Sequence, residues 1–430
     1  MKSLIRSGTS TLAINVLGTG ATISTAMLLT RMMSTEDYGI YVFTMSVVAI
    51  LTTACQFGGQ NLAVKSVAEF ISRGEFRVLS GFLSYVFVLN ICCAVLVALL
   101  LLGVNEFFPQ LAGGRFVSVA AMLIPLYGVS AIVSGVLRGM DSPALGILHE
   151  VVLRPLFLAL ALLIAVGYGH SLVPRDGVLW NVLAASGALM VGLALLRMRL
   201  RGYAVHAPPE YHYLRWFKEA TPLFGVSLIG ALIENIPAWV LISLATPTDV
   251  ALFKVASQGG AFISFILLSL NSVAMPKISA AYAKSDFAEM ESIAQSTVRI
   301  GLIFTLPLLI LFSTLPSEII SLLFGPRYVE AAPALVIYSI GRYCMILLGI
   351  PGAVLLMSGH AHVVMRGWIF SAAMSTLFAL VLAPLFGYVG MAVSLVLGEL
   401  GLNLYLMWRV RRIHGVSTQF SFAPRTSAAL

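Results

Sequence analysis

The chain has 430 residues, of which 59% are hydrophobic and only 10% are charged. Its mean hydropathy is +0.96 and its formal net charge is +8. Water-soluble globular proteins carry about 25% charged residues, so this composition excludes a soluble enzyme and a soluble nucleic-acid-binding domain. The basic residues lie in short segments beside long apolar runs, which is the distribution expected of a membrane protein.

The apolar runs predict an all-α membrane protein with twelve transmembrane helices. Each run is continuous, whereas the strands of a β-barrel alternate apolar and polar residues. Only helices and closed barrels pair every backbone amide in lipid, so helices of about 20 residues are expected. The first six residues show no small-residue cleavage site and predict a cytoplasmic tail before a retained helix. The predicted spans are 9–31, 39–59, 79–103, 116–137, 145–168, 177–197, 220–245, 250–274, 297–315, 329–356, 364–386 and 388–408.

The basic residues orient these spans. When both termini are placed in the cytoplasm, 20 Lys and Arg lie on the inner side and five lie on the outer side. Positively charged residues resist translocation, so this bias predicts that the N-terminus and the C-terminus are both inside. Arg342 belongs to neither side because it lies within a span.

The spans divide into two six-helix lobes that echo each other. Segments of the first half align with segments of the second at an offset of about 212 residues, for example 35–37 with 247–249 and Arg115 with Arg327. Six is an even number, so the two lobes are predicted to run parallel. The predicted domains are an N-terminal lobe (1–200), a cytoplasmic linker (201–219), a C-terminal lobe (220–412) and a cytoplasmic tail (413–430).

Two inner segments at equivalent places, 61–76 and 277–294, are predicted to be short amphipathic helices on the cytoplasmic surface. The alternative is that they are plain connectors with a solvated face.

Motifs of soluble enzymes are absent from the sequence. It contains no phosphate-binding Gly-x4-Gly-Lys-Ser/Thr loop, no Gly-x-Ser-x-Gly and no His-Glu-x-x-His. His360 and His362 lie in one cytoplasmic loop, and two histidines alone rarely bind a metal. A membrane-embedded transferase would need carboxylates and histidines on one face, and they do not cluster. We therefore predict no catalytic residue, no metal site and no enzymatic activity.

Polar groups inside the spans are the candidates for function. A charged side chain at the bilayer centre costs at least about 2.5–3.5 kcal/mol, so it usually faces a cavity or a partner. Glu234 and Arg342 either form a buried structural pair or line a water-filled cleft between the halves, and we favour the cleft. The candidate substrate-binding residues are Arg342, Glu234, Asn235, Asn271, Glu399 and Asn403.

Four further basic residues are secondary candidates. Arg154 follows Glu150 at i, i+4 spacing at the inner end of the fifth span, and an interfacial ion pair is favoured over a substrate clamp. Arg31, Arg138 and Lys254 lie near helix ends and are expected to extend to the lipid headgroups.

The ionic groups are concentrated in the second half. Under the repeat, Glu234 aligns with Thr22 and Arg342 with Ser130. The predicted site is therefore an addition to a symmetric scaffold.

Three segments resemble polysaccharide flippases of the Wzx type, in the MATE-like exporter superfamily. The turn Arg31-Met-Met-Ser-Thr-Glu-Asp-Tyr-Gly-Ile-Tyr41 is similar to their Leu-Ser-x-Glu-Asp-Tyr-Gly turn. Residues 269–279 resemble the end of their eighth span, and Leu323-Phe-Gly-Pro-Arg-Tyr328 resembles their hallmark loop. The resemblance covers nearly the whole chain, including twelve spans in two lobes.

This resemblance implies a flippase of the bacterial cytoplasmic membrane, for O-antigen or exopolysaccharide biosynthesis. Such proteins move undecaprenyl-diphosphate-linked oligosaccharide from the inner to the outer leaflet by alternating access. It implies lipid-linked saccharide and membrane lipids as partners, with polysaccharide polymerase and chain-length machinery, and no nucleic acid. It implies no cofactor and leaves H⁺ or Na⁺ open as a coupling ion. An anion site carries over to Arg342 alone, because the N-terminal lobe lacks obvious mid-span basic residues.

Three alternatives stay open. An ion-coupled multidrug antiporter on the same scaffold usually depends on acidic residues in the first span, and 9–30 contains none. A major-facilitator carrier would show a Gly-x3-Asp-Arg-x-Gly-Arg-Arg-like loop after the second span, which 60–73 does not fit. A membrane scaffold without transport activity gives no reason for Glu234, Arg342 and Glu399 within spans.

Overall fold

The computed structural model describes residues 2–107, 117–167, 172–203 and 208–420, and the regular elements in these ranges are helices. Packing divides the chain into two compact units, Met1–Ala238 and Trp239–Leu430. The boundary falls inside a helix that the sequence assigned to the C-terminal lobe. The predicted lobe and linker limits therefore stay predictions, and each unit is described by itself.

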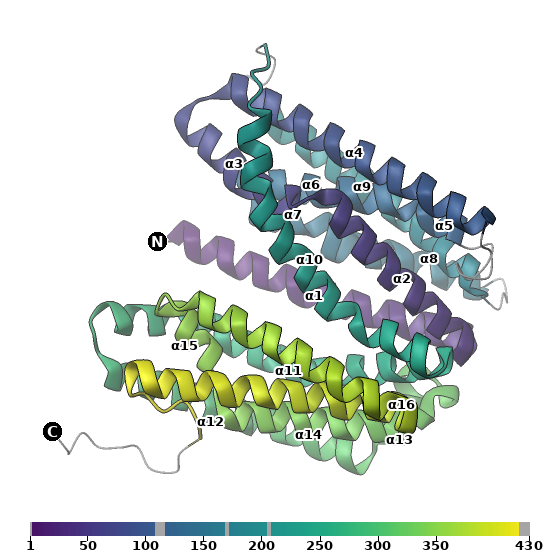
Figure 1. The fold of residues 1–430 in the computed structure, drawn as a ribbon, viewed down its shortest axis with the longest axis vertical. Coiled ribbons are helices and arrows are strands. Elements are labelled where there is room, and N and C mark those ends of the chain that lie inside the picture. The colour runs from purple at the N-terminus through teal and green to yellow at the C-terminus, as the bar shows by residue number, and fades with distance from the viewer. Residues whose placement is uncertain (1, 108–116, 168–171, 204–207, 421–430) are drawn as a thin grey trace. The chain divides into compact units, whose positions relative to one another are not determined.

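The first unit is built almost entirely from long apolar helices (Figure 1). Its last helix, α10, continues six residues past the boundary of the unit. The helices are α1 (Lys2–Met32), α2 (Thr35–Gln56), α3 (Gly59–Arg73), α4 (Phe76–Phe107), α5 (Val117–Ala121), α6 (Leu123–Gly139), α7 (Pro143–Ile147), the π-helix η1 (Leu148–Leu153), α8 (Arg154–Gly167), α9 (Pro174–Leu200) and α10 (Tyr213–Leu244).

The second unit repeats this order with fewer breaks. Its helices are α11 (Pro247–Ala283), α12 (Phe287–Thr314), α13 (Pro316–Phe324), the 3₁₀-helix η2 (Pro326–Ala331), α14 (Ala332–Leu348), α15 (Pro351–Met357) and α16 (Ala361–His414).

Each predicted span coincides with these helices for most of its length, but the second runs past the end of α2 into the turn at Phe57 and Gly58. The tenth crosses a break between α14 and α15, and residues 116 and 168, at the ends of the fourth and fifth spans, lie outside the described residues. Within the described ranges, 11 helices are long and apolar enough to cross a membrane, and the last of them covers two predicted spans. That helix, α16, has 54 residues, which would extend about 80 Å if it were straight. The hydrocarbon core is only about 30 Å thick, so α16 must turn. It does so at Gly387, where φ is 54° and ψ is −134°.

Helix ends confirm the internal repeat. The first helix ends at Met32 and α10 ends at Leu244, 212 residues later. The next helices begin at Thr35 and Pro247, again 212 residues apart. The repeat therefore extends from the sequence to the lengths of the elements.

Matching caps begin the second helix of each copy. Ser34 Oγ accepts a hydrogen bond from the Asp37 N–H at 3.1 Å. Thr246 Oγ1 accepts one from the Asp249 N–H at 3.2 Å, and Asp249 Oδ2 accepts one from the Thr246 N–H at 3.1 Å. The turn whose sequence resembles that of flippases thus has a structural role. Its side chains cap the helix by accepting hydrogen bonds from amide groups that a helix start leaves unpaired.

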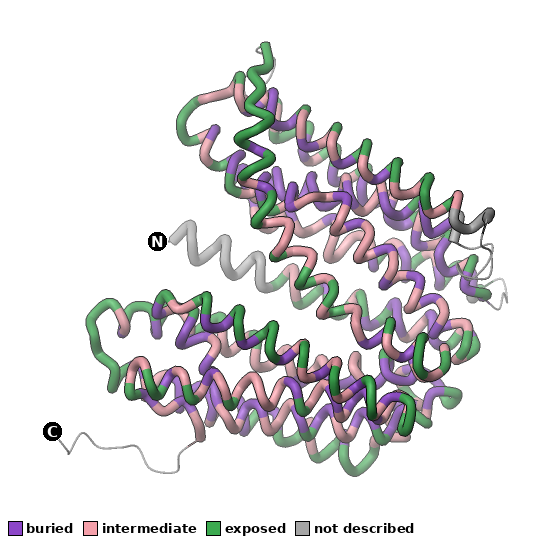
Figure 2. The backbone as a smooth tube through the Cα atoms, in the orientation of Figure 1, coloured by how far each residue is buried: buried purple, intermediate pink, exposed green. Residues whose placement is uncertain are grey.

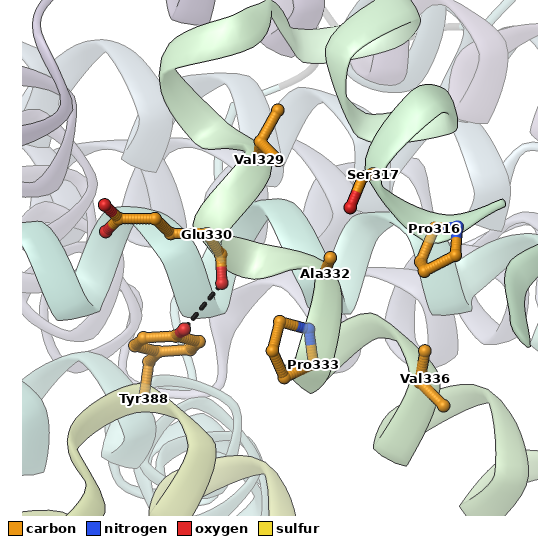
Figure 3. A pocket seen from close by; sticks show the side chains of 8 residues that line it. All are labelled: Pro316, Ser317, Val329, Glu330, Ala332, Pro333, Val336 and Tyr388. Atoms are coloured by element: carbon orange, nitrogen blue, oxygen red, sulfur yellow. Dashed lines mark hydrogen bonds between the residues drawn. The ribbon is translucent and has the colours of Figure 1, made fainter.

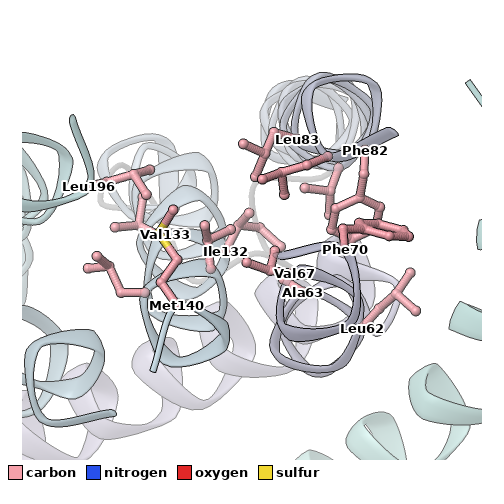
Figure 4. Close-up of a cluster of buried hydrophobic side chains, with 14 of the residues drawn as sticks. Leu62, Ala63, Val67, Phe70, Phe82, Leu83, Ile132, Val133, Met140 and Leu196 are labelled. Carbon is pink, nitrogen blue, oxygen red and sulfur yellow. The ribbon is translucent and has the colours of Figure 1, made fainter. Parts of the chain in front are cut away.

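The predicted amphipathic helix at 61–76 is confirmed as α3. Its buried face, which includes Leu62, Val67 and Phe70, packs on α4 and α6 rather than on lipid (Figure 4). It is a separate helix because the chain turns at Phe57 (φ 45°) and Gly58 (φ 71°).

The second predicted amphipathic helix, 277–294, is wrong. Residues 277–283 continue α11, and 287–294 begin α12. The second unit has no left-handed turn corresponding to Phe57 and Gly58, and Pro276 is accommodated within α11. The chain instead reverses after Lys284, where Ser285 has a φ of 56°.

Exposed apolar residues mark the surfaces that suit lipid. Figure 2 shows the exposed positions of the backbone in green. On α4, the exposed fractions of Leu96, Leu99 and Leu100 are 58%, 60% and 59%. Only 17% of the most apolar window of this helix is buried inside the protein. Side chains of this kind are stable in hydrocarbon and costly in water, so the chain is a multi-pass membrane protein.

The residues after α16 pack back onto the second unit. The Phe420 N–H donates to Leu347 O at 3.0 Å, and the Ser417 N–H donates to Glu291 Oε2 at 3.1 Å. Thr418 is fully buried against Gly349, whose φ is 99°. The first part of the predicted cytoplasmic tail is therefore a strap that closes one end of the helix bundle.

One carboxylate holds two helix starts in the second unit. Besides capping α11, Asp249 accepts a hydrogen bond at Oδ1 from the Tyr388 N–H at 2.9 Å, where the second arm of α16 begins. A Cβ on Gly387 would overlap this oxygen. The position requires glycine for its backbone angles and for its lack of a side chain.

We predict that Gly387→Ala lowers the stability of the protein by about 1–3 kcal/mol, because alanine is strained at this φ and displaces Asp249. The measurement is the melting temperature of the purified protein in detergent. Gly401→Ala is the matched control in the same helix, since its Cβ would meet only Phe370 Cε1 at 3.8 Å. Equal melting temperatures for the two variants would contradict this account of the turn.

Candidate functional site

An arginine, a tyrosine and a glutamate meet inside the second unit. Arg342 Nη2 donates to Tyr338 Oη at 2.8 Å and to Glu399 Oε1 at 3.0 Å. The Arg342 guanidinium carbon also lies 4.9 Å from the centroid of the Tyr338 ring. The side chains of Arg342 and Glu399 are each 26% exposed, so the pair is largely withdrawn from its surroundings.

Helix geometry brings these three residues together. Tyr338 and Arg342 are four residues apart on α14 and therefore share one face. Glu399 comes from the second arm of α16. The two helices approach closely at Gly341, where a Cβ would lie 2.5 Å from Val396 Cγ2. A small residue at this position thus lets the ion pair form.

The carboxylate that pairs with Arg342 is that of Glu399 and not that of Glu234, the partner in the less favoured alternative of a buried structural pair. The charges of Arg342 and Glu399 balance each other, while Arg342 Nε is buried without a partner among the described residues. Glu234 is exposed on α10, in the first unit, and forms no ion pair with a described residue. The sequence identified Arg342 and Glu399 as candidates without indicating that they meet.

The three candidate asparagines have different environments. Asn235 Nδ2 donates to Ala231 O at 2.8 Å, and Asn403 Nδ2 donates to Glu399 O at 3.0 Å, so both amides bond to their own helices. Asn271 on α11 has a buried Oδ1 with no partner in the described part of the chain. Asn271 is therefore the one of the three with a buried acceptor that lacks a partner in the described part of the chain.

A second polar network lies inside the first unit. The Arg154 guanidinium carbon is 4.5 Å from the centroid of the Tyr127 ring. Tyr127 Oη donates to Asn181 Oδ1 at 2.7 Å, and Asn181 Nδ2 donates to Tyr41 Oη at 2.9 Å. These side chains come from α8, α6, α9 and α2, so the network ties four helices together.

The predicted ion pair between Glu150 and Arg154 is wrong, because no salt bridge joins them in the structure. The intervening residues form the π-helix Leu148–Leu153, in which hydrogen bonds run from i to i+5. Arg154 lies instead over the ring of Tyr127. Arg154 is also about midway along the span Pro143–Ala165, and not at the predicted inner end of the fifth span.

The other secondary candidates lie near helix ends. Arg31 in the last turn of α1 and Lys254 near the start of α11 are exposed. Arg138, in the last turn of α6, is half-buried, and its Nε donates to Ser134 O at 3.4 Å.

The two networks lie on equivalent helices but not at equivalent positions. Tyr127 lies on α6 and Tyr338 lies on α14, the equivalent helix of the second unit, and each ring is in contact with an arginine. At the offset of 212 residues, Tyr127 aligns with Ser339 and Arg154 with Arg366. The expectation that the first half lacks a basic residue within its spans is therefore revised. Tyr338 could have been found from its i, i+4 spacing to Arg342. Tyr127 could not, because its arginine comes from another helix.

A pocket of about 550 Å³ lies beside the loop that resembles the flippase hallmark (Figure 3). Tyr388 Oη donates to Glu330 O at 2.5 Å at one side of it. The Glu330 carboxylate points away from the pocket (Figure 3). The earlier copy of this loop, within 106–117, lies mostly outside the described residues. The lining residues are Pro316, Ser317, Val329, Glu330, Ala332, Pro333, Val336 and Tyr388.

Metal ligands do not gather in the described ranges: no three His, Cys, Asp or Glu side chains are placed to share an ion. The ring centroids of His360 and His362 are 6.1 Å apart, and His360 Nδ1 is 3.1 Å from Ser358 Oγ.

Comparison with known proteins identifies the family and the fold of this chain. The family described as "Polysaccharide biosynthesis protein" matches residues 4–281, well over half of the chain. The probable multidrug resistance protein NorM of Rhizobium meliloti is 24% identical over 339 residues, which cover 71% of this chain and 69% of NorM. The capsular polysaccharide biosynthesis protein CapF of Staphylococcus aureus is 27% identical over 183 residues, which cover 41% of this chain and 45% of CapF. The chain spans 30% to 69% of the length of the curated relatives it matches.

Solved structures share the fold. An inward-facing multidrug resistance MATE family transporter of the MOP superfamily superposes with a TM-score of 0.75 at 15% identity, covering 98% of this chain and 100% of the other. The lipid II flippase MurJ, in an inward closed conformation, superposes with a TM-score of 0.71 at 14% identity, covering 95% and 87%. The fold is therefore the all-α MATE-like membrane fold.

We predict that Glu399→Leu lowers stability by about 2–4 kcal/mol, because it leaves the Arg342 charge largely buried without a counter-ion. The double variant Arg342→Met, Glu399→Leu is expected to recover most of the loss, since a well-packed apolar pair can replace a buried ion pair. Melting temperatures in detergent measure both effects. Glu234→Gln, an exposed carboxylate on α10, is the control and is expected to melt like the unaltered protein. A double variant no more stable than Glu399→Leu would contradict the pairing.

Proposed function

Since the chain belongs to the polysaccharide biosynthesis protein family, we propose that it flips undecaprenyl-diphosphate-linked oligosaccharide from the inner to the outer leaflet of the bacterial cytoplasmic membrane. The observation that carries this proposal is the family match over residues 4–281. The MATE-like fold supports it, because that fold also occurs in the lipid II flippase MurJ. The activity is transport, and no reaction is assigned to any residue.

Solvation explains why such a substrate needs a protein. Each sugar hydroxyl that enters hydrocarbon without a hydrogen-bond partner costs several kcal/mol, so the headgroup does not cross unaided. In alternating access, a polar path opens to one side of the membrane at a time. An inside-negative potential favours outward movement of an anionic diphosphate by about 2.3 kcal/mol per charge per 100 mV if the charge moves uncompensated.

Within this proposal, the Arg342–Glu399 pair belongs to the polar path of the second unit. The Arg342 guanidinium attracts a phosphate only while it is separated from Glu399, because the carboxylate otherwise balances the positive charge of the arginine. Glu399 is accordingly the group proposed to carry a coupling proton, and the buried Asn271 Oδ1 is an acceptor that suits a sodium ion. Glu234 and Asn235 on α10 stay candidates for contact with the saccharide, and Asn403 for support of Glu399. No cofactor is proposed.

The partners proposed for the flippase follow from its product. A lipid-linked unit delivered to the outer leaflet is consumed by a polysaccharide polymerase and its chain-length machinery. Anionic membrane lipids are expected around the basic cytoplasmic loops.

The second candidate function is an ion-coupled multidrug antiporter. The likeness to NorM over 339 residues favours it. Against it, the first membrane span, Ala13–Met32, contains no acidic residue to bind a coupling ion or a cationic drug.

We predict that deleting the protein abolishes surface polysaccharide and leaves lipid-linked intermediates on the inner leaflet. Arg342→Ala, expressed at the normal level, is expected to lower surface polysaccharide at least about tenfold, because the guanidinium makes one charge-assisted contact during the transport step in which its pair with Glu399 is broken. The measurement is surface polysaccharide normalised to protein level, and Arg366→Ala, an exposed arginine of α16, is the control.

Full export by Arg342→Ala would show that Arg342 is not part of the polar path. Export that persists without the protein, together with efflux of cationic dyes that requires it, would replace the flippase with the antiporter.

A further inference from the structure

We propose that Arg154 is the anion-binding group of the first unit, and that it binds the phosphate end of an amphiphilic phosphate ester. The inference rests on the proposed function and names the residue that holds the charged part of its substrate. The sequence points to Arg342 as the anion-binding arginine, whereas the structure points to Arg154.

Charge balance separates the two arginines. Arg342 is in an ion pair with Glu399 and bonds to the Tyr338 hydroxyl through the same nitrogen. Arg154 has no hydrogen bond or ion pair with any residue in the described ranges, and its one recorded contact is with the face of Tyr127. A cation inside a membrane protein needs a counter-ion or water. Of the two arginines, only Arg154 has no carboxylate partner among the described residues.

The contact with Tyr127 leaves the binding groups of Arg154 unused. A guanidinium carries five N–H donors in a planar fork, and stacking on a ring engages its face and not these donors. The fork matches two oxygens of one phosphate at once. Arg154 is half-buried, so part of the side chain is reachable.

The network behind Tyr127 holds this arrangement in place. Tyr127 donates its hydroxyl proton to Asn181 at 2.7 Å, and Asn181 donates to Tyr41 at 2.9 Å. Each of these three side chains comes from a different helix of the first unit, α6, α9 and α2 (Figure 1). The ring under the guanidinium is therefore fixed by the bundle, which lowers the entropy that Arg154 loses when it binds a ligand.

The neighbouring charges leave a positive excess. Arg138 and Arg154 are the two cations of this region, and Glu150 is the carboxylate nearest to Arg154 in the sequence. Glu150 forms no salt bridge with either arginine, although it lies four residues before Arg154. Two cations and one carboxylate favour an anion as the missing partner.

The test is the affinity of the full-length protein in neutral-lipid nanodiscs for three probes: undecaprenyl diphosphate, undecaprenol and inorganic diphosphate. We expect undecaprenyl diphosphate to bind most tightly. Arg154→Gln is expected to weaken its binding about tenfold and to leave undecaprenol binding unchanged. Arg342→Gln is expected to weaken diphosphate binding less than about threefold, because that charge is already balanced. Arg366→Gln, at the repeat-equivalent position of Arg154 and exposed on α16, is the matched control and is expected to bind normally.

Glu150→Gln gives a second test in which the affinity is expected to change in the opposite direction. This test does not require Arg154→Gln to fold. Removing the carboxylate raises the local positive charge, so undecaprenyl diphosphate is expected to bind about three times more tightly. Unchanged or weaker binding by Glu150→Gln would overturn the inference.

The remaining outcomes separate this inference from the proposed function. If the unaltered protein binds undecaprenyl diphosphate no better than undecaprenol, the proposed substrate is wrong and the inference falls with it. If the preference exists but survives in Arg154→Gln, the inference alone is wrong. If inorganic diphosphate binds as tightly as the lipid and depends equally on Arg154, the site takes a soluble phosphate and the assignment to an amphiphile is overturned.

Discussion

The structure depends on one constraint: backbone amides inside a bilayer must find partners within the chain. The constraint explains why the spans are helices and why their ends carry caps. Asp249 is the clearest case, since its carboxylate satisfies amide groups at the start of α11 and at the start of the second arm of α16. The turn at Gly387 is possible because this side chain replaces the partners that the broken helix loses.

The same constraint applies to charged side chains, and the two units meet it differently. In the second unit, Glu399 balances Arg342, so the charge is neutralised where the helices pack. In the first unit, Arg154 stacks on the Tyr127 ring. Neither this ring nor Asn181, which is hydrogen-bonded to it, carries a negative charge. A symmetric scaffold thus holds two arginines in unlike electrostatic states.

Particular residues show how far sequence reasoning reached. All twelve spans were predictable because a run of about 20 apolar residues has few other stable structures. The capping turns were recognisable because Ser, Thr and Asp at helix starts have a local role. The pairing of Arg342 was not predictable: the sequence suggested Glu234 as a partner, and it does not show that α14 and α16 meet at Glu399. Glu150 and Arg154 misled because i, i+4 spacing permits an ion pair without requiring one, and Arg154 packs on a ring from another helix.

The sequence by itself determined that this is a multi-pass helical membrane protein with an internal repeat, and it singled out the charged residues inside the spans. These conclusions depend on composition and on spacing along one helix, and both are local properties. Only the tertiary structure decided which charges are balanced, because the partner of a side chain in a helical bundle comes from another helix whose rotation and depth the sequence does not specify. For that reason Arg342, the most conspicuous arginine in the sequence, is the neutralised one, and Arg154 carries the unbalanced charge.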